Sequence, residues 1–146
     1  MIDGVFLTPL KIIEVLGGDV LHAMKRQDSG FIDFGEAYFS TIEPGAVKAW
    51  KRHREMTQNL VVPVGAIKFV LFDEREGACA HGVFEEIVLS RENYCRLTIP
   101  PMVWVGFQGM HKEISMLLNI ASIPHTPEES DRKEKMELDY DWSSNV

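Results

Sequence analysis

Apolar and polar residues alternate with a period close to two through the middle of the chain, and turn residues interrupt the pattern about every ten residues. This period is typical of β-strands, whose successive side chains point to opposite faces of a sheet. Eight strands are predicted in this way: 34–42, 46–54, 59–64, 66–73, 83–89, 95–99, 103–107 and 114–120. Short strands joined by tight turns favour an all-β sandwich or barrel of the jelly-roll kind.

Only two stretches have a helical pattern. Residues 10–16 are expected to form a turn or two of helix before Gly17 and Gly18. The charged run 128–135, which follows Pro127, is expected to form a solvated helical turn. These short helical segments lie near the two ends of the chain. Since no internal repeat or linker separates the strands, residues 1–146 are predicted to form a single domain.

The composition excludes several classes of protein. Hydrophobic residues make up 45% of the chain, which is enough for a buried core. The formal net charge of −7 argues against a nucleic-acid partner, because such partners require clustered basic residues. The longest apolar stretches, such as 60–67, are far shorter than the roughly 20 residues that span a membrane. Cys79 and Cys95, with no leading signal segment, predict free thiols in the cytoplasm.

A continuous motif at residues 89–107 reads LSRENYCRLTIPPMVWVGF. It resembles the signature of the dTDP-4-dehydrorhamnose 3,5-epimerases, in which a loop LS-x-EN leads through a strand and an IP turn to a core strand ending in HGF. Residues 65–75 and 139–142 are similar to two further segments of that family. The chain is therefore identified as an RmlC-like cupin over residues 34–142, and the resemblance implies a jelly roll, or double-stranded β-helix.

The resemblance also implies a function. Proteins of this kind are homodimers that epimerise or isomerise a dTDP-linked or related 4-keto-6-deoxy sugar without a cofactor, in the dTDP-rhamnose and other deoxysugar pathways of surface polysaccharide biosynthesis. This chain differs from the family's pattern at three places that carry catalytic or binding residues. Val105 replaces the histidine of HGF, residues 48–51 (KAWK) replace the motif R-G-L-H that carries a phosphate-binding arginine and the base, and residues 117–119 lie where the family has a tyrosine.

Removal of a proton beside a ketone requires a base of near-neutral pKa and a group that stabilises the enolate. The candidate catalytic bases are Lys51 and His53, which are two residues apart and therefore lie on one face of a strand. Burial would lower the pKa of Lys51 and make a neutral amine available. The alternative role of this basic stretch is to bind phosphate or to face water.

Basic and aromatic side chains beside these two residues are candidates for binding a nucleotide sugar. Crowded positive charge in an acidic protein favours a diphosphate, an amide can bond a sugar hydroxyl, and an indole can stack on a flat ring. The predicted substrate-binding residues are Lys48, Trp50, Arg52, Arg54, Gln58 and Trp104. The alternative roles are ion pairs for the basic residues and core packing for the tryptophans. Arg52 and Arg54 face away from Lys51, so one pocket includes all of them only with a bulge or a subunit interface.

No metal site is predicted. Residues 52–55 offer one histidine and one acid, and Val105 stands where a further ligand would be needed. Two other functions stay open: a sugar-nucleotide-binding cupin that has lost catalysis, and a different small-molecule cupin enzyme with a weak metal site. The sequence identifies neither the nucleotide nor the stereocentre, and it leaves the packing of residues 1–33 open.

Overall fold

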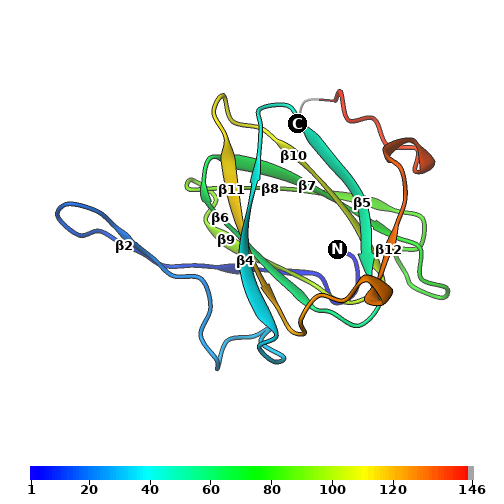
Figure 1. Ribbon diagram of the computed structural model, residues 1–146, viewed down its shortest axis with the longest axis horizontal. Coiled ribbons are helices and arrows are strands. Elements are labelled where there is room, and N and C mark those ends of the chain that lie inside the picture. Colours follow the sequence, from blue (N-terminus) through cyan, green and yellow to red (C-terminus); the bar gives the residue numbers. More distant parts are fainter. Residues whose placement is uncertain (145–146) are drawn as a thin grey trace.

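The fold consists of two five-stranded antiparallel sheets that face each other (Figure 1), in a computed structural model that describes residues 1–144. In the first sheet the strand order is β1 (Phe6–Pro9), β9 (Cys95–Ile99), β6 (Gln58–Val64), β11 (Ser115–Ala121) and β4 (Glu36–Ile42). In the second it is β12 (Ser130–Arg132), β5 (Val47–His53), β10 (Val103–Gly109), β7 (Ala66–Asp73) and β8 (Phe84–Ser90). Residues 145 and 146 of the predicted domain lie outside the described residues.

The predicted all-β jelly roll is confirmed. All eight predicted strands are present, with ends that differ from the prediction by two residues or fewer. Consecutive strands cross between the sheets: β6 belongs to the first and β7 to the second, and β10 belongs to the second and β11 to the first. The apolar face of each sheet is thereby buried against the other, which is the arrangement that period-two alternation requires.

The N-terminal segment forms strands where a helical turn over residues 10–16 was predicted, so that prediction is wrong. β2 (Ile12–Ile13) pairs with β3 (Val20–Leu21) in a hairpin that projects from the sandwich (Figure 1). The β-branched residues of this stretch favour extended backbone. Gly17 and Gly18 at the tip have positive φ, which permits the reversal of the chain. The following loop is fixed by the buried Arg96, which donates to the carbonyls of Ala23 and Ser29 at 2.8 and 2.9 Å.

The charged run 128–135 is also divided differently from the prediction. It contains the end of a 3₁₀ turn, η1 (Pro127–Glu129), then β12 and the start of a second turn, η2 (Lys135–Glu137). β12 pairs with β5, so this stretch belongs to the second sheet and is not a free solvated helix.

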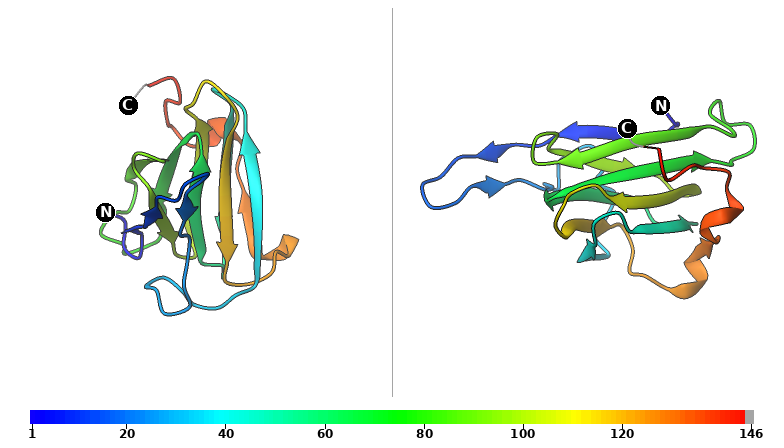
Figure 2. Two further views of the ribbon diagram at one scale, coloured as in Figure 1. Left: turned by 90° about the vertical axis from the view of Figure 1, so that its left-hand side faces the viewer. Right: turned by 90° about the horizontal axis from the view of Figure 1, so that it is seen from above.

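Two apolar clusters stabilise the sandwich. The main core lies between the sheets and includes Ile67, Phe69 and Leu71 of β7. The other faces of β5, β7 and β10 are covered by the C-terminal segment, whose Leu138 and Trp142 join a second cluster. Figure 2 shows this segment, in red, passing along the outside of the second sheet. The sheet that lines the site is therefore buried on both faces.

Gly106 of β10 is a point where this outer packing leaves no room for a side chain. A Cβ atom at this position would lie 2.8 Å from Cβ of Ala49 and 2.8 Å from the ring of Trp142. Gly106→Ala is expected to lower the free energy of unfolding by about 1–3 kcal/mol, because neighbours must shift to accept the methyl group. Urea unfolding measures the change, with Gln108→Ala on the same strand as control. Equal midpoints for the two variants would contradict the prediction.

Candidate active site

A bulge in β5 brings the basic side chains of the site to one face. Val105 and Phe107 of β10 are two residues apart, but they pair with Lys51 and Lys48, which are three apart. The extra residue of β5 shifts the alternation, so that Lys48 and Lys51 face the same side as His53. With regular alternation Lys48 would have pointed to the opposite side from Lys51.

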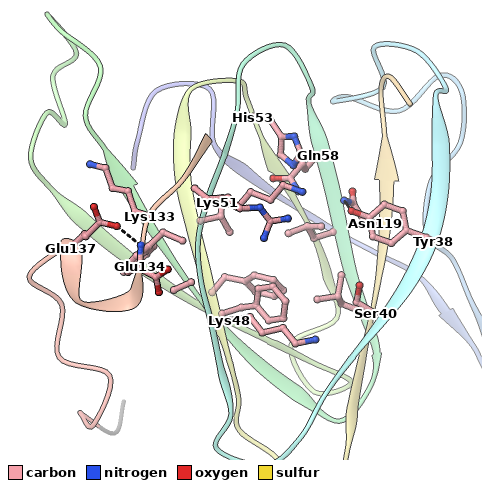
Figure 3. Close-up of a pocket in the computed structure, with 18 residues that line it drawn as sticks. Tyr38, Ser40, Lys48, Lys51, His53, Gln58, Asn119, Lys133, Glu134 and Glu137 are labelled. Atoms are coloured by element: carbon pink, nitrogen blue, oxygen red, sulfur yellow. Dashed lines mark hydrogen bonds between the residues drawn. The ribbon is translucent and has the colours of Figure 1, made fainter. Parts of the chain in front are cut away.

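These side chains enter a cavity of about 630 Å³ between the two sheets, a size typical of small-molecule sites. Figure 3 shows His53 and Gln58 near one end, Lys48 near the other, Tyr38 and Asn119 on one wall, and Lys133, Glu134 and Glu137 on the opposite wall. The other lining residues are Ser40, Ala49, Trp50, Lys51, Leu60, Phe69, Val105, Phe107, Leu117 and Arg132.

The cavity includes five of the eight residues predicted to form the site: Lys48, Trp50, Lys51, His53 and Gln58. Trp50 contributes to the lining but is only 2% exposed. Its indole packs against Trp142, with 5.2 Å between ring centroids, and its Nε1 donates to the carbonyl of Lys135 at 3.2 Å. The Trp50 side chain is thus a core group behind the cavity and has no free face for stacking on a substrate.

The other three predicted residues, Arg52, Arg54 and Trp104, do not line the cavity, because they lie on the outer side of β5 and β10. Both arginines pair with Asp131 of β12. Trp104 donates its Nε1 to Glu74 at 2.8 Å, and the Arg52 guanidinium lies 4.7 Å from its ring centroid. The geometry gives these residues the ion-pairing and packing roles that were the alternatives to substrate binding.

His53 and Glu129 form a buried pair at one end of the cavity. His53 is 4% exposed, and its Nδ1 bonds Oε1 of Glu129. Burial lowers the pKa of His53 below its ordinary value, although the hydrogen bond and charge of Glu129 oppose the change. Burial raises the pKa of Glu129, but hydrogen bonds from His53 and from the N–H groups of Met56 and Glu55 outweigh it and hold that pKa below its ordinary value.

The pair is therefore a neutral imidazole beside a carboxylate at neutral pH. The carboxylate can only accept, so Nδ1 carries the proton and Nε2 has a free lone pair. Nε2 is buried and has no hydrogen-bond partner among residues 1–144. A histidine in this state is suited to remove a proton from a bound molecule.

Lys51 lies between the two walls of the cavity. It is half-buried, and this burial, followed by the positive charge of Arg132, lowers the pKa of its amine from the ordinary value. The carboxylate of Glu129 acts in the opposite direction. A partly desolvated lysine is a strong electrostatic partner for an oxyanion or a phosphate.

Tyr38 and Asn119 face His53 from the first sheet, and Tyr38 is not among the site residues predicted from sequence. The two residues are paired neighbours on β4 and β11, and Asn119 Nδ2 donates to the Tyr38 hydroxyl oxygen at 2.8 Å. The Tyr38 hydroxyl proton is therefore free to be donated into the cavity. The available signal was the alternation in β4, which places Tyr38 and Ser40 on one side of the strand.

Positive charge enters the cavity from β5 and β12, two neighbouring strands of the second sheet. Lys48 Nζ donates to the Thr41 carbonyl at 2.8 Å, and Arg132 projects from β12. Lys133 contacts Glu74 at 3.0 Å. Glu134 and Glu137 bond each other's backbone N–H groups around η2 in a capping box, so their carboxylates are used locally.

Metal-binding geometry and membrane-spanning helices are both absent from residues 1–144. Within this part of the chain, no three His, Cys, Asp or Glu side chains are grouped so that they could hold a metal ion. Nor does any helix there have the length and apolar character needed to cross a membrane.

Comparison with known proteins places the chain in a family, although no family model matches it. RmlC of Legionella pneumophila, a dTDP-6-deoxy-D-glucose-3,5-epimerase, has the same fold, with a TM-score of 0.84 and 20% identity over 98% of this chain and 80% of that one. A probable low-salt glycan biosynthesis epimerase of Haloferax volcanii, Agl13, is 31% identical over 121 residues, 79% of this chain and 77% of the relative. The chain belongs to the RmlC-like epimerase family.

A solved structure matches this RmlC-like protein over nearly its whole length. It is a dTDP sugar isomerase from Desulfovibrio desulfuricans G20, with a TM-score of 0.95 and 39% identity over 99% of this chain and 94% of that one. The similarity therefore extends beyond the cavity to the N-terminal hairpin and the C-terminal segment. The family assignment predicted from residues 34–142 is confirmed.

Proposed function

We propose that this RmlC-like protein epimerises or isomerises a nucleotide-linked 4-keto-6-deoxy sugar, of the dTDP or a related class, through an enolate. The observation that carries the proposal is the buried His53–Glu129 pair, whose unpartnered Nε2 belongs to a residue lining a cavity of ligand size. The relatives support the substrate class, since one is named a dTDP sugar isomerase and another a glycan biosynthesis epimerase. The product would supply deoxysugars for surface polysaccharide.

In this proposal His53 is the catalytic base, and Glu129 orients it. The carboxylate keeps the proton on Nδ1 and stabilises the imidazolium that forms when Nε2 takes a proton from the carbon beside the ketone. Lys51, the other predicted base, has no such partner within residues 1–144. Its charge is better placed to stabilise the enolate oxygen.

Tyr38 is proposed as the acid that returns the proton. It lies on the wall opposite the second sheet, so it would address the substrate from the other side to His53. The hydrogen bond from Asn119 stabilises developing negative charge on the Tyr38 oxygen as the proton leaves. A base and an acid on opposite walls are what inversion of a stereocentre requires.

The substrate-binding set in this proposal is Lys48 and Arg132 for the diphosphate and Gln58 for a sugar hydroxyl. Lys48 and Arg132 reach the cavity from β5 and β12, and a diphosphate favours such paired cations. Gln58 lies beside His53, where its amide can bond the sugar ring (Figure 3). Arg132 replaces Arg52 and Arg54, which are committed to Asp131.

Deuterium exchange tests the function. The protein is incubated with dTDP-4-keto-6-deoxyglucose in heavy water, and the mass of the sugar is followed. A gain of about one or two mass units, formed faster than in the sample without protein, supports enolisation. If dTDP protects the protein against heat but no exchange occurs, the protein is a binding module. Exchange that is lost on addition of a chelator would indicate the alternative metal-dependent cupin enzyme.

We also propose that the protein is a cytoplasmic homodimer whose N-terminal hairpin contacts a second copy. The hairpin carries Ile13, Val15, Leu16 and Val20 on exposed positions, and Leu16 is 103% exposed. β1 and β4 leave the two edges of the first sheet unpaired among the described residues, and such edges favour pairing between chains. The free cysteines support a reducing compartment.

Leu16→Glu is expected to raise the dimer dissociation constant by about tenfold or more, because it places a charge in the apolar contact. Sedimentation velocity over a concentration series measures the change. Met136→Glu, at an apolar position on η2 that is 87% exposed, is the matched control and is expected to leave association unchanged. A wild-type protein that sediments as a monomer at all concentrations would contradict the dimer.

A further inference from the structure

We propose that Asp131 is a positioning residue, which holds Glu129 against His53 from the outer face of the second sheet. This inference rests on the proposed function, because it concerns the same pair. Asp131 does not line the cavity and would touch neither substrate nor His53. Its effect on the reaction is exerted through the strand on which it lies.

β12 is only three residues long, and its alternation divides its side chains between two tasks. Ser130, Asp131 and Arg132 pair with His53, Arg52 and Lys51 of β5. Arg132 therefore points into the cavity with Lys51, and Asp131 points outward with Arg52. Glu129 immediately precedes β12, so the position of the Glu129 side chain depends on how β12 pairs with β5.

Asp131 joins the two strands through both of its carboxylate oxygens. Oδ2 accepts from Arg52 Nε at 3.1 Å and Nη2 at 2.8 Å. Oδ1 accepts from Arg54 Nε at 3.1 Å and Nη2 at 2.5 Å. Asp131, Arg52 and Arg54 thus form a clamp between β12 and β5. Hydrogen bonds from Arg54 and then Arg52 lower the pKa of Asp131 to about 2, so its carboxylate is charged at neutral pH. Each arginine directs two N–H groups at one carboxylate oxygen, and these charge-assisted hydrogen bonds fix direction as well as distance.

One of the two arginines also contacts the backbone of Glu129. The N–H of Arg54, whose side chain holds Asp131, donates to the Glu129 carbonyl at 2.7 Å. Arg52 is further fixed by its ring contact with Trp104. Without Asp131, two arginines of like charge face β12 with no partner there, and β12 is expected to shift relative to β5. The His53 imidazole then loses its fixed tautomer.

Kinetic coupling to Glu129 tests the clamp. Asp131→Asn is expected to lower kcat for deuterium exchange by about tenfold, the size of a typical coupling between neighbouring groups. In a Glu129→Gln background the same substitution is expected to change kcat less than twofold, as the effect passes through Glu129. Equal losses in both backgrounds, or an unchanged kcat in the single variant, would overturn the proposal. Asp19→Asn, which breaks the exposed pair with Arg91 at 3.1 Å, is the matched control.

A second readout needs no substrate and separates this inference from the proposed function. The nitrogen-15 shifts of the His53 ring, assigned with His53→Gln, are expected to show the Nδ1-protonated tautomer in wild type and in Asp19→Asn. In Asp131→Asn they are expected to move toward an average of two tautomers. If wild type fails to exchange deuterium, these shifts still test whether Asp131 positions Glu129 against His53. Unaltered shifts in folded Asp131→Asn would overturn it.

A milder variant covers the case in which Asp131→Asn does not fold. Arg54→Gln removes one half of the clamp at a side chain that is 57% exposed, so the fold should persist. It is expected to produce a smaller shift of the His53 ring signals in the same direction. Wild-type ring signals in folded Arg54→Gln, together with an unfolded Asp131→Asn, would assign Asp131 a purely structural role.

Discussion

His53→Gln is expected to lower kcat for deuterium exchange by about 10²–10⁴-fold, because a glutamine amide cannot accept a proton from carbon. The substitution keeps a polar side chain of similar reach beside Glu129, so the fold and the cavity should persist. Protection against heat by dTDP is expected to remain within about twofold of wild type, since Lys48 and Arg132 are unchanged. Exchange is measured by mass spectrometry of the sugar, and protection by thermal unfolding with and without dTDP.

His81→Gln is the control for this experiment. His81 lies exposed in the turn between β7 and β8, away from the cavity, and its loss is expected to leave kcat unchanged. A fully active His53→Gln would exclude His53 as the base. If Lys51→Ala were then inactive with normal dTDP protection, the role of base would pass to Lys51.

Glu129→Gln is expected to lower the maximal kcat by about 10²–10⁴-fold, although Glu129 touches no substrate. The glutamine can present its NH₂ group to His53 Nδ1, which places the imidazole proton on Nε2 and removes the lone pair that acts as base. Its oxygen still accepts from the N–H groups of Glu55 and Met56, so the local backbone is retained. The pH profile of kcat measures the effect.

The direction of the pH dependence follows from the pKa of His53. Burial lowers this pKa below 6.5, so wild type is expected to stay active below pH 6.5 until His53 is protonated. The Glu129 carboxylate raises the same pKa, and its removal is expected to move the acidic limb of the profile to lower pH. Glu128→Gln, an exposed neighbour, should keep the wild-type profile. A Glu129→Gln profile with wild-type height and midpoint would contradict the assigned role.

The stability of the fold should respond to acid in the same direction. Both partners have pKa values below their ordinary ones in the folded protein. The unfolded chain then binds more protons than the folded one, so the free energy of unfolding decreases as the pH falls. The loss begins near 6.5 for His53 and near 4.5 for Glu129, the ordinary values of the two groups. The contribution of Glu129 is fully present above pH 4.5.

The strands and the family could be predicted from sequence because both depend on residues that are close together along the chain. Alternation in stretches such as 66–73 and 95–99 predicts strands whose ends the structure reproduces. The motif at 89–107 is continuous along the chain and identifies the family without a model of the fold. The prediction of an N-terminal helical turn was wrong because the apolar spacing of residues 10–16 fits more than one structure. The hairpin forms because β2 pairs with β3, and the sequence of 10–16 alone does not show that partner.

The site depended on contacts between residues distant in sequence. His53 was identified as a candidate from its motif, but its partner Glu129 is 76 residues away and lies in a charged run that resembles a solvated surface. Tyr38 and Asn119 meet only because β4 pairs with β11, 81 residues apart. The bulge in β5 directs the Lys48 side chain toward the cavity. Arg52 and Arg54 lie outside it, where both pair with Asp131. Local periodicity determines which residues are strand and which are apolar, whereas strand register and long-range ion pairs decide which polar groups share one cavity.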